Sequence, residues 1–251
     1  MAKEEHPNIW IVKPGENSNR GCGIEVADTL SEIKTLINTH SRSNGNRTSI
    51  VQLYIDRPLL ISGRKFDVRA FAMLTSTNGL LKGFMYRDCY LRTSSKPFDL
   101  SNFNRYIHLT NDAVQEGDED YGKFENANKL SINDFQRYLD TNHEDKSISF
   151  MRDLFPRMER LVTDTFRAVY NKVDPNRNQN GFEIFGYDFM IDEDFKVYLI
   201  EVNTNPSFEV HCPLMARIIP ELLDNSFRLS LDPIYQPQSL LEPQVKTCAT
   251  Q

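Results

Sequence analysis

Few cysteines occur in the sequence, and they are widely separated. The 251 residues contain four cysteines, and no CxxC pair occurs among them. Zinc sites and redox motifs need cysteines at close spacing, and disulfide-stabilised proteins of small size need a denser set. The sequence therefore predicts neither a disulfide framework nor a zinc site, and it favours a reduced intracellular protein.

Long apolar segments and an excess of positive charge are also missing. No run approaches the roughly 20 apolar residues that cross a bilayer, and the first residues, MAKEEHPN, lack the apolar stretch of a signal peptide. The net charge is −6, so the overall electrostatics favour neither nucleic acid nor an acidic partner. We expect no membrane and no nucleic-acid partner, and any site for an anion must be a local basic cluster.

Residues 8–55 predict a first unit of strand, loop, helix and strand. A buried strand at 8–13 leads into a glycine-rich loop, and a helix follows at about 27–38. A polar surface loop at 40–49 then precedes an apolar strand at 50–55. The predicted apolar face of the helix consists of Leu30, Ile33, Leu36 and Ile37. A domain rarely opens directly on its central strand, so we expect a further portion of the protein before it.

Residues 57–232 predict a second, larger unit, which makes the whole chain α+β. A strand of strict alternation and its returning strand are joined by the turn Thr77-Asn78-Gly79. Ser131 is predicted to cap a short helix, and a longer helix carries an apolar stripe that includes Val169. The predicted strands are 64–76, 80–92, 183–192 and 195–203, and the predicted helices are 132–140, 150–173 and 213–229. Residues 233–251 are predicted to be a flexible tail.

The acidic hairpin formed by the last two strands carries the clearest chemical signal. Glu201 and Asn203 are two residues apart on one strand, so their side chains share a face, and the turn places Asp188 near Glu201 on the partner strand. Two buried carboxylates repel each other, and a divalent cation relieves that repulsion. Carboxylate and carboxamide oxygens suit Mg²⁺. A structural network in which Lys or Arg pairs with both acids explains the spacing equally well.

Two basic features suggest a phosphate site. The loop Gly15–Gly23 has the composition to cradle phosphates with backbone N–H groups, and Lys13 precedes it at the end of a strand. The pattern differs from GxxxxGK[ST], and glycine-rich turns are common, so the loop alone indicates little. The charges of Lys65, Asp67 and Arg69 share one face of the next long strand, which is typical of a solvated face but also of a phosphoryl-transfer site.

The HLTND run adds a polar cluster, His108, Thr110 and Asn111. Side chains of these types cap helices and turns as readily as they serve catalysis, and the sequence does not separate the two roles.

Six ordered motifs, over about residues 8–231, resemble the tubulin tyrosine ligase-like family. The string IWIVKPGENSNRGCGI is similar to the family's WI-x-KP…GxGI segment, and QLYIDRPLLISGRKFDVR is similar to its Q-x-Y-I…G-R-K-F-D-x-R segment. YRDCYLRTSS, HLTND, YGKFE and FGYDFMIDEDFKVYLIEVNTNPS follow in the family's order.

This resemblance implies an ATP-grasp fold, with residues 1–56 as part of the central subdomain and 57–232 as the C-terminal catalytic subdomain. It implies ATP and Mg²⁺, with Asp188, Glu201 and Asn203 as metal ligands and Lys65, Arg69 and Arg92 as catalytic residues. Lys65 and Asp67 would also contact the nucleotide. The other nucleotide-binding residues it implies are Lys13, Arg20, Gly21, Gln52, Leu53, Tyr54, Ile55, His108, Thr110 and Asn111. Of these, Gln52, Leu53, Tyr54 and Ile55 would line the adenine pocket.

The resemblance also implies a reaction, a partner and a location. A substrate carboxylate would attack the γ-phosphate of ATP, and an amine would displace phosphate from the acylphosphate. The partner would be a tubulin tail or a microtubule, and the location the cytoplasm and cytoskeleton, including the cilium or basal body.

The run Asn203-Thr204-Asn205-Pro206-Ser207 is similar to that of glutamate and glycine ligases, so free glutamate is favoured as the added amino acid, ahead of glycine and tyrosine. Family members carry a further N-terminal domain that contributes a lysine. A chain without that lysine would bind nucleotide or microtubules without catalysis. A catalytically silent binding module is therefore the alternative to an active enzyme.

Overall fold

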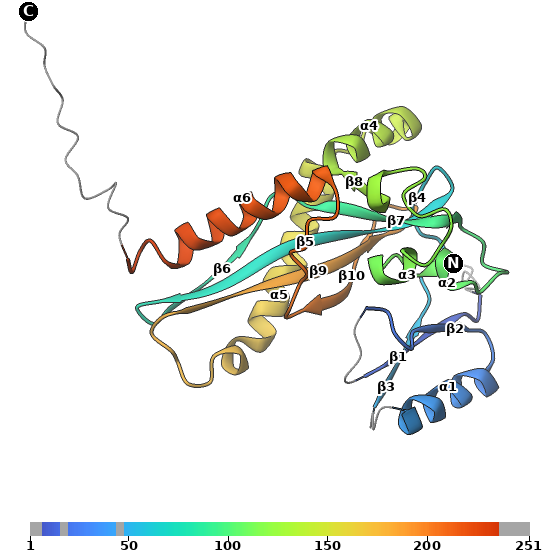
Figure 1. Cartoon of the computed structure of the whole chain (residues 1–251), viewed down its shortest axis with the longest axis horizontal. Helices are drawn as coiled ribbons and strands as arrows, with labels where there is room; N and C mark the ends of the chain where they lie inside the picture. The colour runs from blue at the N-terminus through green and yellow to red at the C-terminus, as the bar shows by residue number, and fades with distance from the viewer. Residues whose placement is uncertain (1–6, 16–19, 44–47, 236–251) are drawn as a thin grey trace, which may run out of the picture.

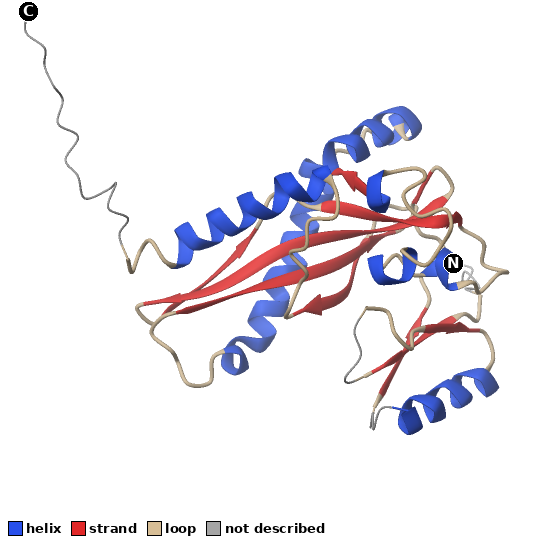
Figure 2. Cartoon of the chain, in the orientation of Figure 1, coloured by secondary structure: helices blue, strands red, loops and turns tan. Residues whose placement is uncertain are grey.

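The computed structural model describes residues 7–15, 20–43 and 48–235, which form two antiparallel sheets flanked by helices (Figures 1 and 2). The smaller sheet has the order β2-β1-β3, with β1 at Trp10–Pro14, β2 at Glu25–Ala27 and β3 at Ser49–Leu53. Helix α1 (Leu30–Ser43) lies against one face of it. Val12, Ala27 and Ile33 form the small core between them.

The larger sheet has seven strands, and the long strand β5 (Arg64–Thr77) lies at its centre. Strand β9 pairs with one side of β5, while β7 and β6 pair with successive halves of its other side. The order along the main path is β10-β9-β5-β7-β8, and all of these pairings are antiparallel. The remaining strands are β4 (Leu60–Ile61), β6 (Leu80–Met85), β7 (Tyr90–Pro97), β8 (Lys129–Ser131), β9 (Gly181–Ile191) and β10 (Val197–Asn203).

Helices cover both faces of this sheet (Figure 1). Helices α4 (Ile132–Asn142) and α5 (Phe155–Val173) pack on one face, and α6 (Pro213–Ser230) packs on the other. A π-helical turn, Phe150–Leu154, leads into α5. The shorter turns are α2 (Arg105–His108), α3 (Asp112–Gln115), and the 3-10 turns Asn126–Asn128 and Glu144–Lys146. None of the described helices is long and apolar enough to cross a membrane.

Strict alternation along β5 builds the two cores. Phe66, Val68 and Ala70 point into the large core beneath α4 and α5. Phe71 and Met73 point the other way, into the core beneath α6. Every residue from Arg64 to Ser76 is buried, so the charged residues on the second face of β5 are buried as well.

The first unit departs from its prediction mainly at its helix. Helix α1 begins at Leu30 and not at residue 27, because Thr29 Oγ1 accepts a hydrogen bond from the backbone N–H of Glu32 and so caps the helix there. Leu30 is 65% exposed and does not belong to the apolar face. Residues 25–27 form β2 instead, and the helix continues through His40 into the predicted loop.

The second unit follows its prediction more closely. Ser131 caps α4 as predicted, since its hydroxyl accepts from the N–H of Asp134. The acidic hairpin is confirmed as β9 and β10. The prediction of a single returning strand at 80–92 is wrong, because residues 86–89 are not part of a strand and separate β6 from β7. Val169 is 40% exposed, outside the core stripe of α5. Most of the predicted tail, 236–251, lies outside the described residues.

Candidate active site

The charged face of β5 is buried and forms the floor of the candidate site. Lys65, Asp67 and Arg69 are 3%, 5% and 8% exposed, so the solvated-face interpretation is wrong. Arg92 on β7 lies directly opposite Asp67, and Asp188 on β9 lies directly opposite Arg69. The sheet register therefore brings these side chains together on one face.

Two arginines and two aspartates form a continuous network there. Arg92 donates two hydrogen bonds of 2.7 Å to Asp67 and a third of 2.7 Å from Nη2 to Asp188 Oδ2. Arg69 donates from Nε and Nη2 to the two oxygens of Asp188, at 2.5 and 3.1 Å. Burial alone would raise the pKa of the Asp188 carboxyl, but the guanidinium groups of Arg92 and Arg69 outweigh it and hold that pKa below its ordinary value. Asp188 is therefore ionised.

Glu201 lies opposite Asp188 in the β9–β10 register but has a different environment. Its carboxylate accepts a hydrogen bond of 3.3 Å from the Asn203 amide. Glu201 forms no ion pair with Lys or Arg in the described part of the chain. The structural network that the sequence suggested for both acids therefore includes only Asp188. Burial, and then the like charge of Asp188, raise the pKa of Glu201.

The donor set at this point fits Mg²⁺. Asp188, Glu201 and Asn203 offer carboxylate and carboxamide oxygens, the ligands that Mg²⁺ prefers. Each carboxylate oxygen carries two lone pairs, so Asp188 keeps acceptor capacity beside its arginines. No cluster of three or more His, Cys, Asp or Glu side chains with metal-site geometry occurs among the described residues, so the third ligand here would be a carboxamide.

Lys13 brings the smaller sheet to this site. Burial lowers the pKa of its ammonium, and the charges of Glu201 and Asp188 act in the opposite direction. Lys65 donates to the Tyr54 hydroxyl at 2.8 Å and to the His108 carbonyl at 2.9 Å. Burial lowers the pKa of Lys65 to about 7; Asp67 opposes this effect and Lys13 adds to it. Neither lysine forms an ion pair with a described carboxylate.

Residues 52–55, which were predicted to contact adenine, lie only partly on the side of the charged cluster. Tyr54 is buried and its hydroxyl bonds to His108 Nδ1 at 2.7 Å. Gln52 pairs with Ile11 in the small sheet and shares the face that carries Lys13. Leu53 pairs with Trp10 on the opposite face and is 46% exposed. Ile55 follows the strand and is half-buried.

The described end of the glycine-rich loop meets the HLTND run. Gly21 has φ +73°, and a Cβ there would lie 2.8 Å from Val114 Cγ2 and 3.5 Å from Asn111 Oδ1. Arg20, also with positive φ, is exposed beside it. Residues 16–19 of this loop lie outside the described part of the chain.

The polar residues of HLTND do not act as side-chain helix caps. Thr110 Oγ1 donates to Asp67 Oδ2 at 2.5 Å, and the Asn111 side chain makes no capping bond at α3. His108 bonds to Tyr54 and to the carbonyl oxygen of Asn102. Thr110 and His108 therefore support the charged cluster, a role that the sequence alone did not distinguish from capping.

Two supporting residues were not predicted. His40 is buried, and its Nε2 lies 2.9 Å from the carbonyl oxygen of Gly23, so it holds the end of the glycine-rich loop. Glu125 accepts from both terminal nitrogens of Arg64 and from Thr93, which fastens the YGKFEN segment to the sheet. A histidine in a polar stretch and a glutamate in a loop give no signal of such contacts in the sequence.

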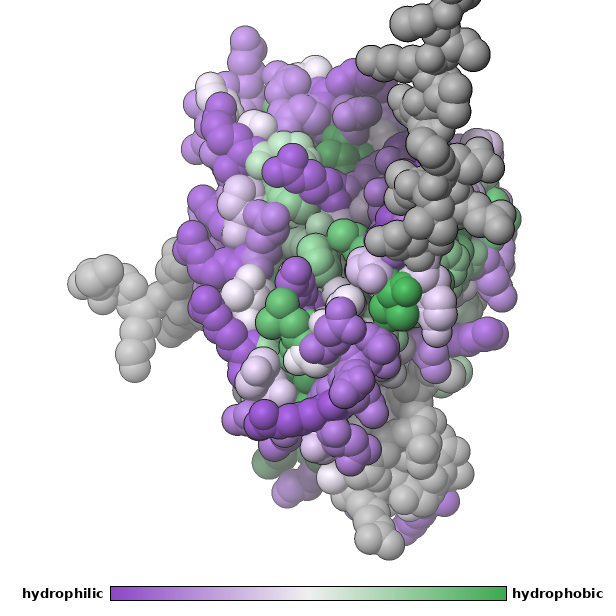
Figure 3. Space-filling view, turned by 90° about the vertical axis from the view of Figure 1, so that its left-hand side faces the viewer, coloured by the Kyte–Doolittle hydropathy of each residue, from purple (hydrophilic) through white to green (hydrophobic). Residues whose placement is uncertain are grey.

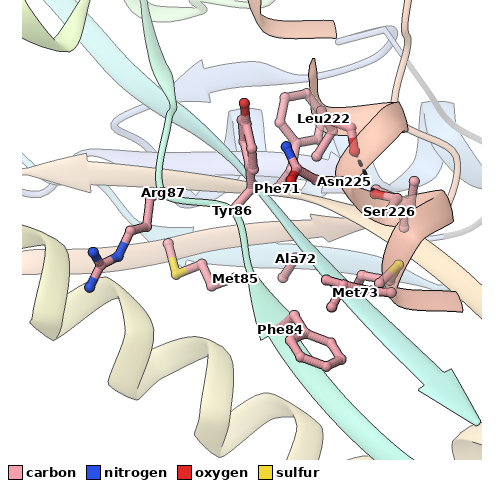
Figure 4. Close-up of a pocket in the computed structure, with 12 residues that line it drawn as sticks. Phe71, Ala72, Met73, Phe84, Met85, Tyr86, Arg87, Leu222, Asn225 and Ser226 are labelled. Carbon is pink, nitrogen blue, oxygen red and sulfur yellow. Dashed lines mark hydrogen bonds between the residues drawn. The ribbon is translucent and has the colours of Figure 1, made fainter. Parts of the chain in front are cut away.

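A cavity of about 280 Å³ lies elsewhere, between α6 and the sheet (Figure 4). Its lining is mainly apolar, includes Phe71, Met73 and Leu222, and contains none of the predicted site residues. Figure 3 views the molecule from the end that carries the β5–β6 turn and shows mostly hydrophilic side chains with small hydrophobic areas between them.

Comparison with known proteins identifies a matching family and several relatives. A family model described as "Tubulin-tyrosine ligase family" matches residues 1–240. Tubulin glycylase 3A of Drosophila melanogaster is 35% identical over 240 residues, which are 94% of this chain and 23% of that protein. Tubulin monoglycylase TTLL3 of Homo sapiens is 34% identical over 229 residues, 90% of this chain and 29% of that protein. The chain thus spans less than a third of the length of these curated relatives.

Proposed function

The chain belongs to the tubulin-tyrosine ligase family, and from this premise we propose that it forms the ATP-binding and catalytic part of a ligase that adds glycine to tubulin. One observation carries the proposal. The charge of Lys13, from the small sheet, interacts with Glu201 and Asp188, and the charge of Lys65, from the large sheet, interacts with Lys13 and Asp67. Adjacent cations beside oxygen ligands suit a metal-bound triphosphate.

We further assign the α+β fold to the ATP-grasp class, with the nucleotide held between the two sheets. In this assignment the division at residue 56 separates the subdomain that supplies Lys13 and Gln52 from the one that supplies the charged floor. Phosphates would lie beside Lys13, Lys65 and the Gly21 end of the loop, where backbone N–H groups and ammonium groups attract anions. Asp188, Glu201 and Asn203 would hold Mg²⁺, which would neutralise phosphate charge.

The proposed reaction proceeds in two displacements. An oxygen of a glutamate carboxylate in a tubulin tail bonds to the γ-phosphorus of ATP, and the bond to ADP breaks. The amine of glycine then bonds to the acyl carbon, phosphate leaves, and the nitrogen loses a proton. Arg69 keeps Nη1 free of described partners and would stabilise charge on the transferred phosphoryl group. Arg92 would hold Asp188 ionised beside it.

Glycine replaces glutamate as the favoured amino acid. The Asn203–Ser207 run is shared by both ligase types, so it did not separate them. The two relatives described above are named as a glycylase and a monoglycylase, and so is the protein monoglycylase TTLL8 of Mus musculus, 31% identical over 229 residues. Their names support a tubulin partner and a site of action at the cytoskeleton.

Incorporation of labelled amino acid tests the proposal. The protein is incubated with ATP, Mg²⁺, microtubules and radiolabelled glycine, glutamate or tyrosine, both as the 251-residue chain and as a chain extended at its N-terminus. We expect glycine incorporation that disappears in Glu201→Gln. Incorporation of glutamate alone by either protein would contradict the choice of glycine, and nucleotide binding with no transfer by both would contradict the ligase activity.

A further inference from the structure

We infer that Tyr54 and His108 are positioning residues that aim the Lys65 ammonium at the nucleotide, through a chain of hydrogen bonds with one direction. The inference rests on the proposed function, because it assumes that Lys65 binds a phosphate of ATP. It differs from the sequence-based role for Tyr54, which placed that residue in the adenine pocket.

The chain begins at a backbone carbonyl, and this fixes its direction. His108 Nε2 lies 2.8 Å from the carbonyl oxygen of Asn102. A carbonyl oxygen only accepts hydrogen bonds, so Nε2 carries a proton and donates it. In the neutral ring Nδ1 then has a free lone pair. Tyr54 lies 2.7 Å from Nδ1 and therefore donates its hydroxyl proton to it.

The neutral form of His108 is favoured by its surroundings. The rings of Tyr54, Phe98 and Phe103 contact the imidazole, with centroids 5.4, 6.0 and 6.2 Å away. Burial among these rings lowers the pKa of His108, and the nearby charge of Lys65 lowers it further against the bond to Asn102. A protonated ring would have no lone pair for Tyr54, so neutrality keeps the chain intact.

The Tyr54 oxygen is left as an acceptor, and Lys65 uses it. Lys65 Nζ donates to this oxygen at 2.8 Å and to the backbone carbonyl of His108 at 2.9 Å. An ammonium group has three protons, and no third acceptor for it occurs among the described residues. The two occupied directions fix the third, which remains available for an anionic oxygen of the substrate.

The charged groups around Lys65 influence its protonation, so loss of the Tyr54 acceptor should be detectable in the pH dependence of binding. Asp67 from β5 favours its charged form, while Lys13 from β1 disfavours it. The two groups that accept from Lys65, the Tyr54 hydroxyl and the His108 carbonyl, are uncharged. Tyr54 contributes an acceptor that stabilises the charged ammonium. Removal of this acceptor should therefore both misdirect Lys65 and favour its neutral form.

The test uses Tyr54→Phe, with Tyr187→Phe as the matched control. Tyr187 also loses a buried phenolic hydrogen bond, to Thr165 at 2.7 Å, but on the opposite face of the sheet. Affinity for a non-hydrolysable ATP analogue with Mg²⁺ is measured by calorimetry from pH 6 to pH 9. We expect Tyr54→Phe to bind about tenfold more weakly at pH 7, since hydrogen bonds to charged groups contribute this much or more. The pH at which affinity declines should also move downward, while Tyr187→Phe matches the wild type.

His108→Phe provides a second, independent variant. It keeps the ring but removes both nitrogens, so Tyr54 loses its acceptor. The double variant should bind no more weakly than Tyr54→Phe, because both changes break one chain. An affinity and pH dependence of Tyr54→Phe equal to those of the wild type would overturn the positioning role and leave the proposed function standing. Failure of the wild type to bind the analogue would instead overturn the proposed function, and this inference with it.

Discussion

Asp188 and Glu201 lie opposite each other on β9 and β10, yet arginines pair with only one of them among the described residues. Arg69 and Arg92 both donate to Asp188, whereas Glu201 accepts from the Asn203 amide. The two carboxylates therefore have opposite pKa shifts, downward for Asp188 and upward for Glu201. This difference predicts opposite effects on stability for two similar substitutions.

Glu201→Gln should stabilise the protein slightly while it abolishes ligase activity. The change removes a carboxylate that faces Asp188, so we expect the Tm to rise by about 2 °C at pH 7. The pKa of Glu201 is higher in the folded protein than in the unfolded chain, so the wild type loses stability as the pH rises through that pKa. The gain in Tm from the substitution should therefore vanish at acidic pH. Thermal unfolding at pH 4 and pH 7, without Mg²⁺, provides the measurement. A loss of stability at pH 7 would contradict the repulsion.

Asp188→Asn should destabilise the protein by about 3–5 kcal/mol, the typical effect of removing one partner from a buried ion pair. Arg69 and Arg92 would keep their charges, and Arg69 would lose its carboxylate partner. Because the folded-state pKa of Asp188 is lowered, the stability it contributes is present above its unfolded pKa and is lost as pH falls. Denaturant unfolding at pH 7 measures the effect, and a change below 1 kcal/mol would rule out the network as a stabilising feature.

Loss of the Arg69 side chain should slow the reaction without much loss of nucleotide binding. Arg69→Ala is expected to lower kcat by a factor of about a thousand, because cations beside the transferred phosphoryl group typically contribute that much. The variant also removes one partner of Asp188, so its Tm is measured alongside. Glycine incorporation at saturating ATP is the measurement, and an unchanged kcat in a folded variant would exclude this role.

Much of the site followed from the strand periodicity of the sequence. Alternation placed Lys65, Asp67 and Arg69 on one face, and a two-residue spacing placed Glu201 beside Asn203; the structure confirms both. Periodicity could not show that this charged face is buried, because the segment that covers it is irregular. Thr110 and His108 reach Asp67 and Tyr54 from that segment, over separations of 43 and 54 residues.

The errors in the fold have a similar origin. A helix that began at 27 would contain Thr29, but the Thr29 hydroxyl instead accepts from the N–H of Glu32 and caps a helix that begins at Leu30. The division of the returning strand into β6 and β7 depends on which half of β5 each one pairs with. Such pairing is a long-range property that local patterns do not contain.

The low pKa of Lys65 predicts an alkaline limit to ATP capture. Its ammonium is charged below about 7 and neutral above, so kcat/KM for ATP should fall as pH rises through that value in the free protein. Bound phosphate favours the charged form, so kcat itself should persist to higher pH. Lys65→Arg keeps its charge throughout and should lose this limb of the profile, whatever its absolute rate. A wild-type kcat/KM that stays constant from pH 6 to pH 9 would exclude a role for Lys65 charge in ATP capture.

Gly21→Ala should weaken ATP binding, and Gly79→Ala is its matched control for backbone strain. Gly21 and Gly79 have nearly equal backbone angles, φ +73° and +76°, so alanine introduces left-handed strain of about 1–2 kcal/mol at either position. A Cβ at Gly21 would lie 2.8 Å from Val114 Cγ2, whereas a Cβ at Gly79 would meet nothing within 4 Å. Only the first change should displace the glycine-rich loop from the HLTND segment. We expect Gly21→Ala to raise KM for ATP about tenfold, while Gly79→Ala lowers the Tm but leaves KM unchanged. Equal KM values in the two variants, with both folded, would show that the loop does not depend on this close approach to bind the nucleotide.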